Sequence, residues 1–172
     1  MIPIILVATD EEYLFAKKYF SDQIVIRTGI GSLNVIRTLA TLLCTFKIQN
    51  IHIVNVGYAG SNVIKKGTVV RVKNSCNYNW PVNVEYDCGL NEVTFSTEGV
   101  DCYSSNEFVT ETKIKEPVVF DMELNTITAF PLWKVSAYKI VSDNLDYNEY
   151  EKFDKEESWK ELRKRISEEL GI

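Results

Sequence analysis

The feature that most constrains the fold is an alternation of short apolar runs with helical patterns near the start of the chain. Residues 2–8, 23–28 and 51–56 are rich in Ile and Val, as strands of a buried parallel sheet are. Between them, residues 10–20 begin with acids and residues 33–46 space their apolar side chains with a helical period. Strands joined by helices form right-handed crossovers. The sequence therefore predicts a β-α-β-α-β opening and an α/β fold with a mostly parallel sheet.

The rest of the chain is expected to extend the same domain. Residues 68–103 carry runs of Val, Tyr, Thr and Phe interrupted by Asn, Pro and Gly, a pattern typical of antiparallel strands or hairpins. The further expected elements are strands at 118–121 and 135–142 and helices at 123–130 and 155–170, the last stopped by Gly171. A length of 172 residues suits one domain with its own core, so residues 1–172 are interpreted as a single unit.

The charge pattern excludes whole classes of partner. Lys plus Arg is 19 and Asp plus Glu is 24, which gives a formal net charge of −5, and no basic block stands out. Binding to a nucleic-acid backbone draws on clustered cations, so it is not expected. The sequence shows neither a signal-peptide pattern nor the roughly 18 consecutive apolar residues of a membrane span. A cytoplasmic protein without membrane contact is therefore expected.

Metal and cofactor sites are not expected either. The four cysteines form no CxxC pair and His52 is the one histidine, whereas zinc sites use closely spaced thiols or several histidines. Free thiols fit a reducing compartment. A dinucleotide-binding domain is disfavoured, because the turn at residues 29–31 lacks the third glycine of GxGxxG and no acid follows at the expected distance.

Carboxylates gather where the predicted strands end. Residues 9–12, 121–123 and 142–143 each contain Asp or Glu, and residues 57–60 form a fourth, glycine-rich strand end. Ligands of open α/β sheets bind at the carboxyl ends of the strands, so these segments are expected to meet at one site. Acids at helix starts also stabilise the helix dipole, and spacing alone does not separate the two interpretations.

Short segments in a fixed order carry a resemblance to a known family. They are VATDEE (7–12), GIGSLN (29–34), NVGYAG (55–60), SNEFV (105–109), FDME (120–123) and VSDNLD (141–146). Together they resemble the successive signatures of the 5′-methylthioadenosine/S-adenosylhomocysteine nucleosidases and related purine nucleoside phosphorylases, in a shortened form. The resemblance implies a three-layer nucleoside-phosphorylase-like fold, with a central mixed, mostly parallel sheet flanked by helices.

The resemblance also implies the partners of the chain. The ligand would be a small nucleoside, bound without a cofactor or metal, and the protein would form a homodimer or a higher homo-oligomer. Candidate aromatic residues for contact between subunits are Tyr78, Trp80 and Trp133, which are equally compatible with burial.

The reaction implied by the resemblance is hydrolysis of an N-glycosidic bond, which passes through an oxocarbenium-like transition state. Asp143 would deliver a proton toward N7 of the departing purine, with Ser142 orienting it. Glu12 would activate the attacking water. An ordinary interpretation of Ser142 and Asp143 is a helix cap.

The binding residues follow from the same resemblance. Glu123 would hydrogen-bond the ribose hydroxyls, with the Met122 side chain against the sugar. Phe108 would stack on the base, and the backbone of Val109 would read its edge. The remaining candidates for the substrate site are Tyr58, Ala59, Gly60, Asp121 and Lys139. Phe108 and Met122 are also compatible with ordinary core positions.

Three positions depart from the family pattern. Asp121 stands where Glu is usual, and Lys139 stands where Arg is usual, so bidentate guanidinium geometry is lost. Tyr58 replaces a small Ser, which predicts a narrower pocket. The departures leave a phosphorylase and a non-catalytic nucleoside-binding protein open beside the hydrolase. Hydrolysis is favoured because the acids of residues 10–12 would repel a phosphate, which arginines and backbone amides normally bind.

Overall fold

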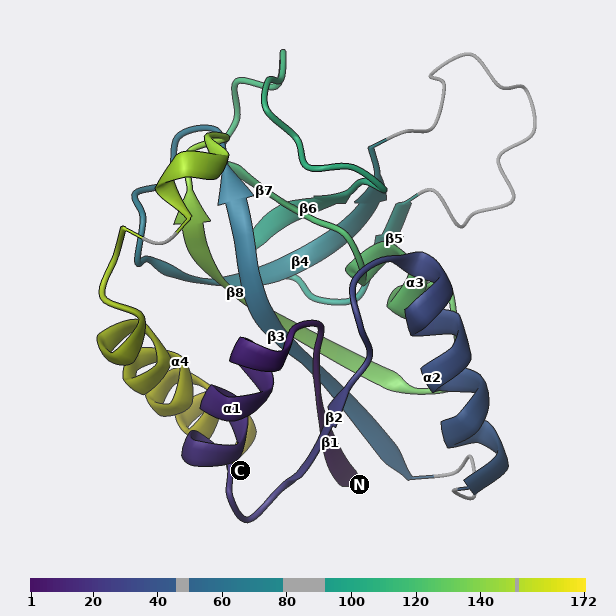
Figure 1. Cartoon of the computed structure of the whole chain (residues 1–172). Helices are drawn as coiled ribbons and strands as arrows, with labels where there is room; N and C mark the ends of the chain where they lie inside the picture. Colours follow the sequence, from purple (N-terminus) through teal and green to yellow (C-terminus); the bar gives the residue numbers. More distant parts are fainter. Residues whose placement is uncertain (46–49, 79–91, 151) are drawn as a thin grey trace, which may run out of the picture.

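The computed structural model describes residues 1–45, 50–78, 92–150 and 152–172, which form one mixed sheet and two pairs of helices (Figure 1). The strands are β1 Ile2–Val7, β2 Ile24–Arg27, β3 Ile51–Ser61, β4 Val69–Asn77, β5 Glu92–Thr94, β6 Val100–Ser104, β7 Val118–Asp121 and β8 Lys134–Asp143. The helices are α1 Asp10–Tyr19, α2 Ser32–Thr45, α3 Leu124–Thr128 and α4 Lys155–Leu170, and the 3₁₀ turn η1 covers Tyr147–Glu149.

The strand pairings close part of the sheet on itself. Strand β1 pairs in parallel with β2 and with β3, as the β-α-β-α-β prediction requires. From β3 the pairings run through β7, β6, β4 and β8 and return to β3. Three of the pairings are antiparallel: β3 with β7, β4 with β5, and β4 with β8. The long strand β3 therefore belongs both to the open edge with β1 and β2 and to the closed ring.

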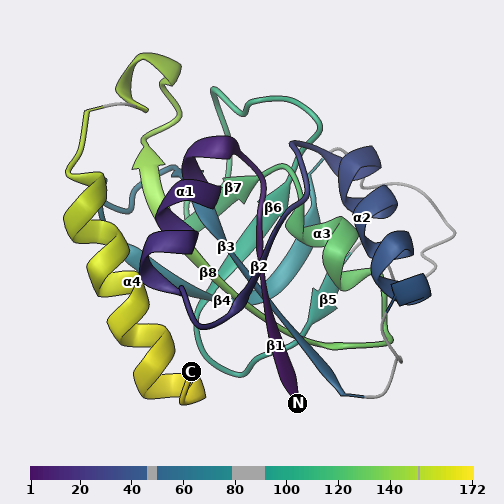
Figure 2. The same ribbon diagram turned by 60° about the horizontal axis from the view of Figure 1, so that its bottom comes forward.

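Two hydrophobic cores lie on opposite sides of the sheet (Figures 1 and 2). Helices α1 and α4 contact each other and bury apolar side chains in one core, among them Ala16, Trp159, Leu162 and Ile166. Helices α2 and α3 contact each other and fill the other core, with side chains such as Val35, Leu39, Leu124 and Ile127. The prediction of a central mixed sheet with helices is confirmed. The pairings do not confirm a mostly parallel, three-layer arrangement, because antiparallel pairs help to curl five strands into a ring.

Several predicted boundaries are corrected. The strand expected to end at Val56 continues to Ser61, because its last residues keep ladder partners in β7 and β8. The helix expected at residues 123–130 shortens to Leu124–Thr128. The terminal helix ends as predicted, with Gly171 in the left-handed region at φ 68°.

The segment 68–103 is partly antiparallel. Strands β4 and β5 pair antiparallel, as predicted, but β6 runs parallel to both β4 and β7. The turn signals expected at residues 81 and 87–89, and Trp80, lie outside the described residues. Of the other aromatic candidates for subunit contact, Trp133 is buried and Tyr78 packs edge-on against Tyr103 and Phe120.

The cysteines, the possible metal ligands and the helix lengths can be read from the described residues. Cys44, Cys76 and Cys102 are free thiols, and Cys88 lies outside the described ranges. Within those ranges no group of His, Cys, Asp and Glu could hold a metal ion, and no helix is both long and apolar enough to cross a bilayer.

The core under α4 can be tested by truncation. Leu162 is fully buried, whereas Leu14 on α1 is 70% exposed. Leu162→Ala is expected to lower the free energy of unfolding by about 2–5 kcal/mol through lost burial and a cavity. Leu14→Ala is the matched control and should change it by less than about 0.5 kcal/mol. Urea denaturation measures both, and equal effects would contradict the packing of α4 on this face.

Candidate active site

The carboxyl end of β3 is the centre around which the predicted site residues gather. Gly60 lies opposite Phe120 of β7 on one side and opposite Asp143 of β8 on the other. Strands β7 and β8 therefore flank the end of β3 on its two edges (Figure 1).

Glu12 reaches this backbone from helix α1. Its Oε2 accepts hydrogen bonds from the N–H groups of Ala8 at 2.9 Å and Thr9 at 2.8 Å, and its Oε1 accepts from the N–H of Tyr58 at 2.8 Å. The Thr9 hydroxyl accepts from the N–H of Glu12, so the two residues form a capping box. The start of α1 is thereby tied to strand β3 through one buried carboxylate.

Two glycines make these close approaches possible. A Cβ at Gly57 would lie 2.5 Å from Oε1 of Glu12, which is far inside van der Waals contact. A Cβ at Gly60 would lie 2.9 Å from Oδ1 of Asp143. The β3 backbone is therefore bare at the two places where carboxylates press against it.

Asp143 ends β8 and is 1% exposed. Its Oδ2 accepts from the Ser142 hydroxyl at 2.7 Å, and its Oδ1 accepts from the N–H of Leu145 at 3.0 Å. Burial raises the pKa of Asp143 above its ordinary value, although the two hydrogen bonds act in the opposite direction. A carboxyl group whose pKa is raised keeps a proton to donate at higher pH, as a general acid requires.

Glu123 follows β7 and is 7% exposed. Its Oε1 accepts from the N–H of Gly31 at 2.8 Å, and its Oε2 from the N–H of Met122 at 3.3 Å. Burial and the charge of Asp121 raise the pKa of Glu123 to about 7, while Lys139 acts to lower it. The charge of Glu12 also raises this pKa, so the two glutamates share one electrostatic environment.

A buried ion pair lies beside Glu123. The Nζ of Lys139 is 2.7 Å from Oδ2 of Asp121, and the two side chains are 2% and 1% exposed. Burial alone would lower the pKa of Lys139, but the charge of Asp121 raises it above its ordinary value. Asp121 also accepts hydrogen bonds from the Ser104 hydroxyl and the N–H of Leu124. Lys139 is therefore charged and sealed from solvent.

A shallow hollow opens at this end of the sheet. It is lined by Gly60, Glu107, Phe108, Val109, Phe120, Asp121 and Met122. Phe108 is 38% exposed and meets the ring of Tyr147 edge-on at 5.5 Å between centroids. The hollow thus joins an exposed aromatic face to the strand ends that carry the acids.

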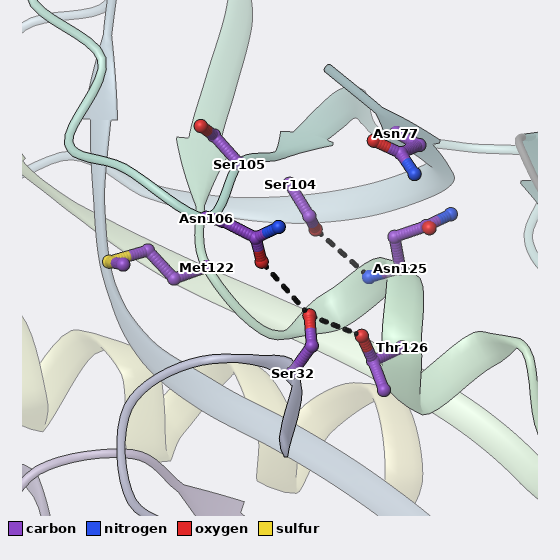
Figure 3. A pocket seen from close by; sticks show the side chains of 8 residues that line it. All are labelled: Ser32, Asn77, Ser104, Ser105, Asn106, Met122, Asn125 and Thr126. Atoms are coloured by element: carbon purple, nitrogen blue, oxygen red, sulfur yellow. Dashed lines mark hydrogen bonds between the residues drawn. The ribbon is translucent and has the colours of Figure 1, made fainter. Parts of the chain in front are cut away.

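A second, more polar hollow adjoins the first across Met122, which lines both (Figure 3). Its other lining residues carry hydroxyl or amide groups: Ser32, Asn77, Ser104, Ser105, Asn106, Asn125 and Thr126. Within it the Ser32 hydroxyl lies between Asn106 and Thr126, and Ser104 accepts from the N–H of Asn125 (Figure 3). These bonds join α2, α3 and the end of β6 below the hollow.

The structure brings most of the predicted site residues to one end of the sheet. Met122, Phe108, Val109, Gly60 and Asp121 line one hollow. The acids Glu12 and Asp143 reach the same stretch of β3, and Glu123 lies two residues after Asp121. Whether each of them contacts a substrate stays a prediction.

Two expectations change when the side chains are placed. The ring of Tyr58 packs edge-on against Phe153 and Trp159, and its hydroxyl accepts from Nε1 of Trp159 at 2.9 Å. The predicted narrowing of the pocket by this ring is therefore wrong, since only the backbone of Tyr58 faces Glu12. Ala59 is buried in the core beneath α2 and α3, and Lys139 contacts Asp121 behind the hollow.

Some contributors carried no assigned role in the sequence. Gly31 belongs to a recognised motif, but its N–H bond to Glu123 joins segments far apart in the chain. Ser104 gave no signal at all, because a lone Ser at a strand end is common. Asp10 and Glu11, by contrast, pair with Arg27 and Lys155 and take no part in the hollow.

The fold and the site together define the class of protein: an α/β protein with buried acids around the carboxyl ends of a mixed sheet. The amino-acid sequence matches no protein-family model and no curated protein. Solved structures do match, and among them are nucleosidases of the family that the ordered sequence motifs resemble.

A 5′-methylthioadenosine/S-adenosylhomocysteine nucleosidase from Helicobacter pylori, with butyl-thio-DADMe-Immucillin-A, aligns over 98% of this chain and 99% of its own at a TM-score of 0.77 and 15% identity. The futalosine hydrolase of Helicobacter pylori aligns over 97% and 98% at 0.77 and 15%. The corresponding nucleosidase of S. pneumoniae, with the transition-state inhibitor MT-ImmA, aligns over 97% of each chain at 0.76 and 15%. The chain therefore has the fold of these nucleosidases.

The raised pKa of Glu123 predicts a pH dependence of stability. In the unfolded chain this carboxyl titrates near its ordinary 4.5, and in the folded protein near 7. Between these values the native state holds a proton that the unfolded state has lost, so stability falls as pH rises from about 4.5 to 7 and then levels off. Relative to Glu123→Gln, which stays neutral, this decline should amount to about 3 kcal/mol.

Denaturant unfolding at several pH values measures the difference between the native protein and Glu123→Gln. Glu98→Gln, at an exposed position, is the control and should leave the pH profile unchanged. Parallel profiles for the native protein and Glu123→Gln would show that Glu123 titrates normally in the folded state.

Proposed function

We propose that the protein hydrolyses the N-glycosidic bond of a purine nucleoside of the methylthioadenosine or S-adenosylhomocysteine type. The observation that carries the proposal is the convergence of Glu12 and Asp143 on the bare backbone between Gly57 and Gly60, next to a hollow with an exposed aromatic wall. The fold shared with nucleosidases of known structure supports the same reaction class.

Asp143 is proposed as the general acid. Its burial and raised pKa favour a protonated carboxyl, and a proton given to N7 stabilises the departing purine. The Ser142 hydroxyl holds Oδ2, and the N–H of Leu145 holds Oδ1, so the carboxyl has one fixed orientation. A fixed donor loses little freedom when the reaction begins.

Glu12 is proposed as the residue that binds and activates water. An ionised carboxylate has about four acceptor positions, and three of those of Glu12 receive backbone N–H groups. One position stays open for a further donor. A water held there can lose its proton to Glu12 as it attacks the oxocarbenium-like sugar.

The binding residues divide the substrate between them in this proposal. Phe108 stacks on the base and the Val109 backbone contacts its edge, because both line the hollow with Gly60. Met122 lies against the sugar, and Glu123 in its ionised form accepts hydrogen bonds from the ribose hydroxyls. The bond from Gly31 holds Oε1 of Glu123 in place while the carboxylate keeps acceptor capacity.

The described residues favour water over phosphate as the attacking group. A phosphorylase holds its phosphate with free cations. Arg27 contacts Asp10, and the amine of Lys139 contacts Asp121, so neither of these cations faces the hollow in the part of the chain that the structure describes. Several buried carboxylates at the same strand ends would repel a dianion.

The reaction class is tested by incubating the protein with methylthioadenosine, S-adenosylhomocysteine, inosine and adenosine, with and without phosphate. Release of free base without phosphate is the expected result. Release only with phosphate would make the protein a phosphorylase. Tight binding without release under either condition would make it a nucleoside-binding protein, and neither binding nor release would remove the proposed function altogether.

The protein is also proposed to form a homodimer or a higher homo-oligomer. Helix α2 presents Leu33, 83% exposed, and Ile36, 44% exposed, to the surface, and Ile30 precedes them at 53%. Exposed apolar side chains in one patch commonly mark a protein contact. Sedimentation of the native protein and of Leu33→Glu tests this, since a single monomeric species for the native protein would contradict it.

The role of Asp143 leads to a mutational prediction. Asp143→Asn keeps the shape of the side chain and removes the proton donor, so turnover should fall by about 10²-fold or more. Substrate binding should change far less, since the hollow is unaltered. Steady-state and single-turnover rates of base release measure the effect. Asp22→Asn, at an exposed site, is the control, and a rate for Asp143→Asn close to that of the control would exclude Asp143 as the acid.

A further inference from the structure

The buried pair of Lys139 and Asp121 does more than satisfy two charges, because it is built into the segment that carries Glu123. Oδ2 of Asp121 accepts from Nζ of Lys139 at 2.7 Å and also from the N–H of Leu124, the first residue of α3, at 3.0 Å. Asp121 therefore bridges strand β8 to the start of α3. Glu123 lies in the short turn between the end of β7 and the start of α3.

The turn is held from a second direction by Ser104 at the end of β6. Its hydroxyl donates to Oδ1 of Asp121 and accepts from the N–H of Asn125 at 2.9 Å (Figure 3). Glu123 itself makes no capping bond to α3, so its carboxylate is free to reach the N–H of Gly31. The position of Glu123 thus depends on the Asp121 side chain, which holds the first turn of α3.

Lys139 acts on Glu123 as well as on Asp121, because its positive charge lowers the pKa of Glu123. Asp121 of β7 and Glu12 of α1 are the acids that act on Glu123, and Lys139 of β8 is the cation. Cys102 of β6 also lies beside Asp121, and burial raises the pKa of its thiol, so the thiol carries no charge near neutral pH. Without Lys139, two buried carboxyls would face each other with no counter-charge among these groups.

We propose that Lys139 is a positioning residue for ribose recognition: held outside the hollow, it supplies the counter-charge of Asp121, the cap of α3, and thereby lets Glu123 act as a carboxylate in the orientation that ribose hydroxyls need. This inference rests on the proposed function for its ligand. Its electrostatic part concerns only the chain and is testable without any substrate.

The experiment compares the native protein with Lys139→Met and with the double variant Asp121→Asn/Lys139→Met. Methionine keeps the length of the lysine stem and removes the charge, and the double variant removes both charges of the pair. Lys18→Met is the matched control, since Lys18 makes an exposed ion pair with Glu156 on the surface. Carboxyl ¹³C NMR follows the titration of Asp121 and Glu123, and thermal melting checks the fold of each variant.

In Lys139→Met, the two carboxyls should be protonated to a larger extent near neutral pH than in the native protein. The later of their two titrations should move up by about one pH unit or more, as expected for loss of an opposite charge within contact distance. The double variant removes both the negative charge of Asp121, which raises the pKa of Glu123, and the positive charge of Lys139, which lowers it. The pKa of Glu123 in this variant should therefore lie within about one unit of its native value. Lys18→Met should titrate like the native protein.

Equilibrium binding connects the titration to recognition. A ribonucleoside should bind Lys139→Met roughly tenfold more weakly at neutral pH, and the affinity should recover at higher pH as Glu123 ionises. Its 2′-deoxy analogue, which offers Glu123 one hydroxyl fewer, should lose much less. A merely structural role for Lys139 would weaken both ligands equally at every pH.

The outcomes separate this inference from the proposed function. If the native protein binds no nucleoside but Glu123 titrates higher in Lys139→Met, the function fails and the electrostatic role stands. If the native protein binds ribonucleosides and Lys139→Met matches it in titration and affinity ratio, the role of Lys139 is overturned. If Lys139→Met does not fold, the pKa of Glu123 is compared between the native protein and the double variant. A pKa far above the native one in the double variant would overturn the inference.

Discussion

The arrangement of the site depends on the contact between two carboxylates and the bare backbone of one strand. Strand β3 runs between β7 and β8 with glycine at positions 57 and 60, so no side chain keeps Glu12 or Asp143 away. Glu12 uses this space to accept the N–H of Tyr58, which fixes the start of α1 against the sheet. Asp143 uses it from the opposite side. Larger residues at either glycine would displace Glu12 or Asp143 from this stretch of β3.

Gathering acids in this way has an electrostatic cost that the surrounding elements offset. Three backbone N–H groups from two segments stabilise the carboxylate of Glu12, and Lys139 stabilises that of Asp121. Burial, together with the charge of Asp121, raises the pKa of Glu123 to about 7 even though Lys139 and the N–H of Gly31 act to lower it. Asp143, whose pKa is also raised, stands on the other side of β3. Burial thus raises the pKa of two of these acids, Glu123 and Asp143, which favours the protonated form that a proton donor needs.

The sequence predicted those parts of the fold that depend on local pattern. The β-α-β-α-β opening follows from apolar runs and helical spacing, and the end of α4 follows from Gly171. Residues 57–60 were interpreted as the glycine-rich segment that closes a strand ending at Val56, yet pairing with β7 and β8 extends β3 to Ser61. The orientation of Tyr58 toward α4 and the contact of Lys139 with Asp121 depend on strand register between distant segments. No local sequence pattern determines the register between distant strands, so these features could not be predicted. The acids themselves were identified because ordered motifs placed them at strand ends.

The most direct test of this account is a crystal structure with a bound nucleoside analogue that is not cleaved. The account predicts the base against the ring of Phe108, with its N7 edge within hydrogen-bond distance of Asp143. It also predicts the sugar above Met122, with its hydroxyls on Glu123 and a water between Glu12 and the anomeric carbon. An analogue bound elsewhere, or bound here with Asp143 and Glu123 both out of contact, would contradict the central claim that these acids surround one sugar.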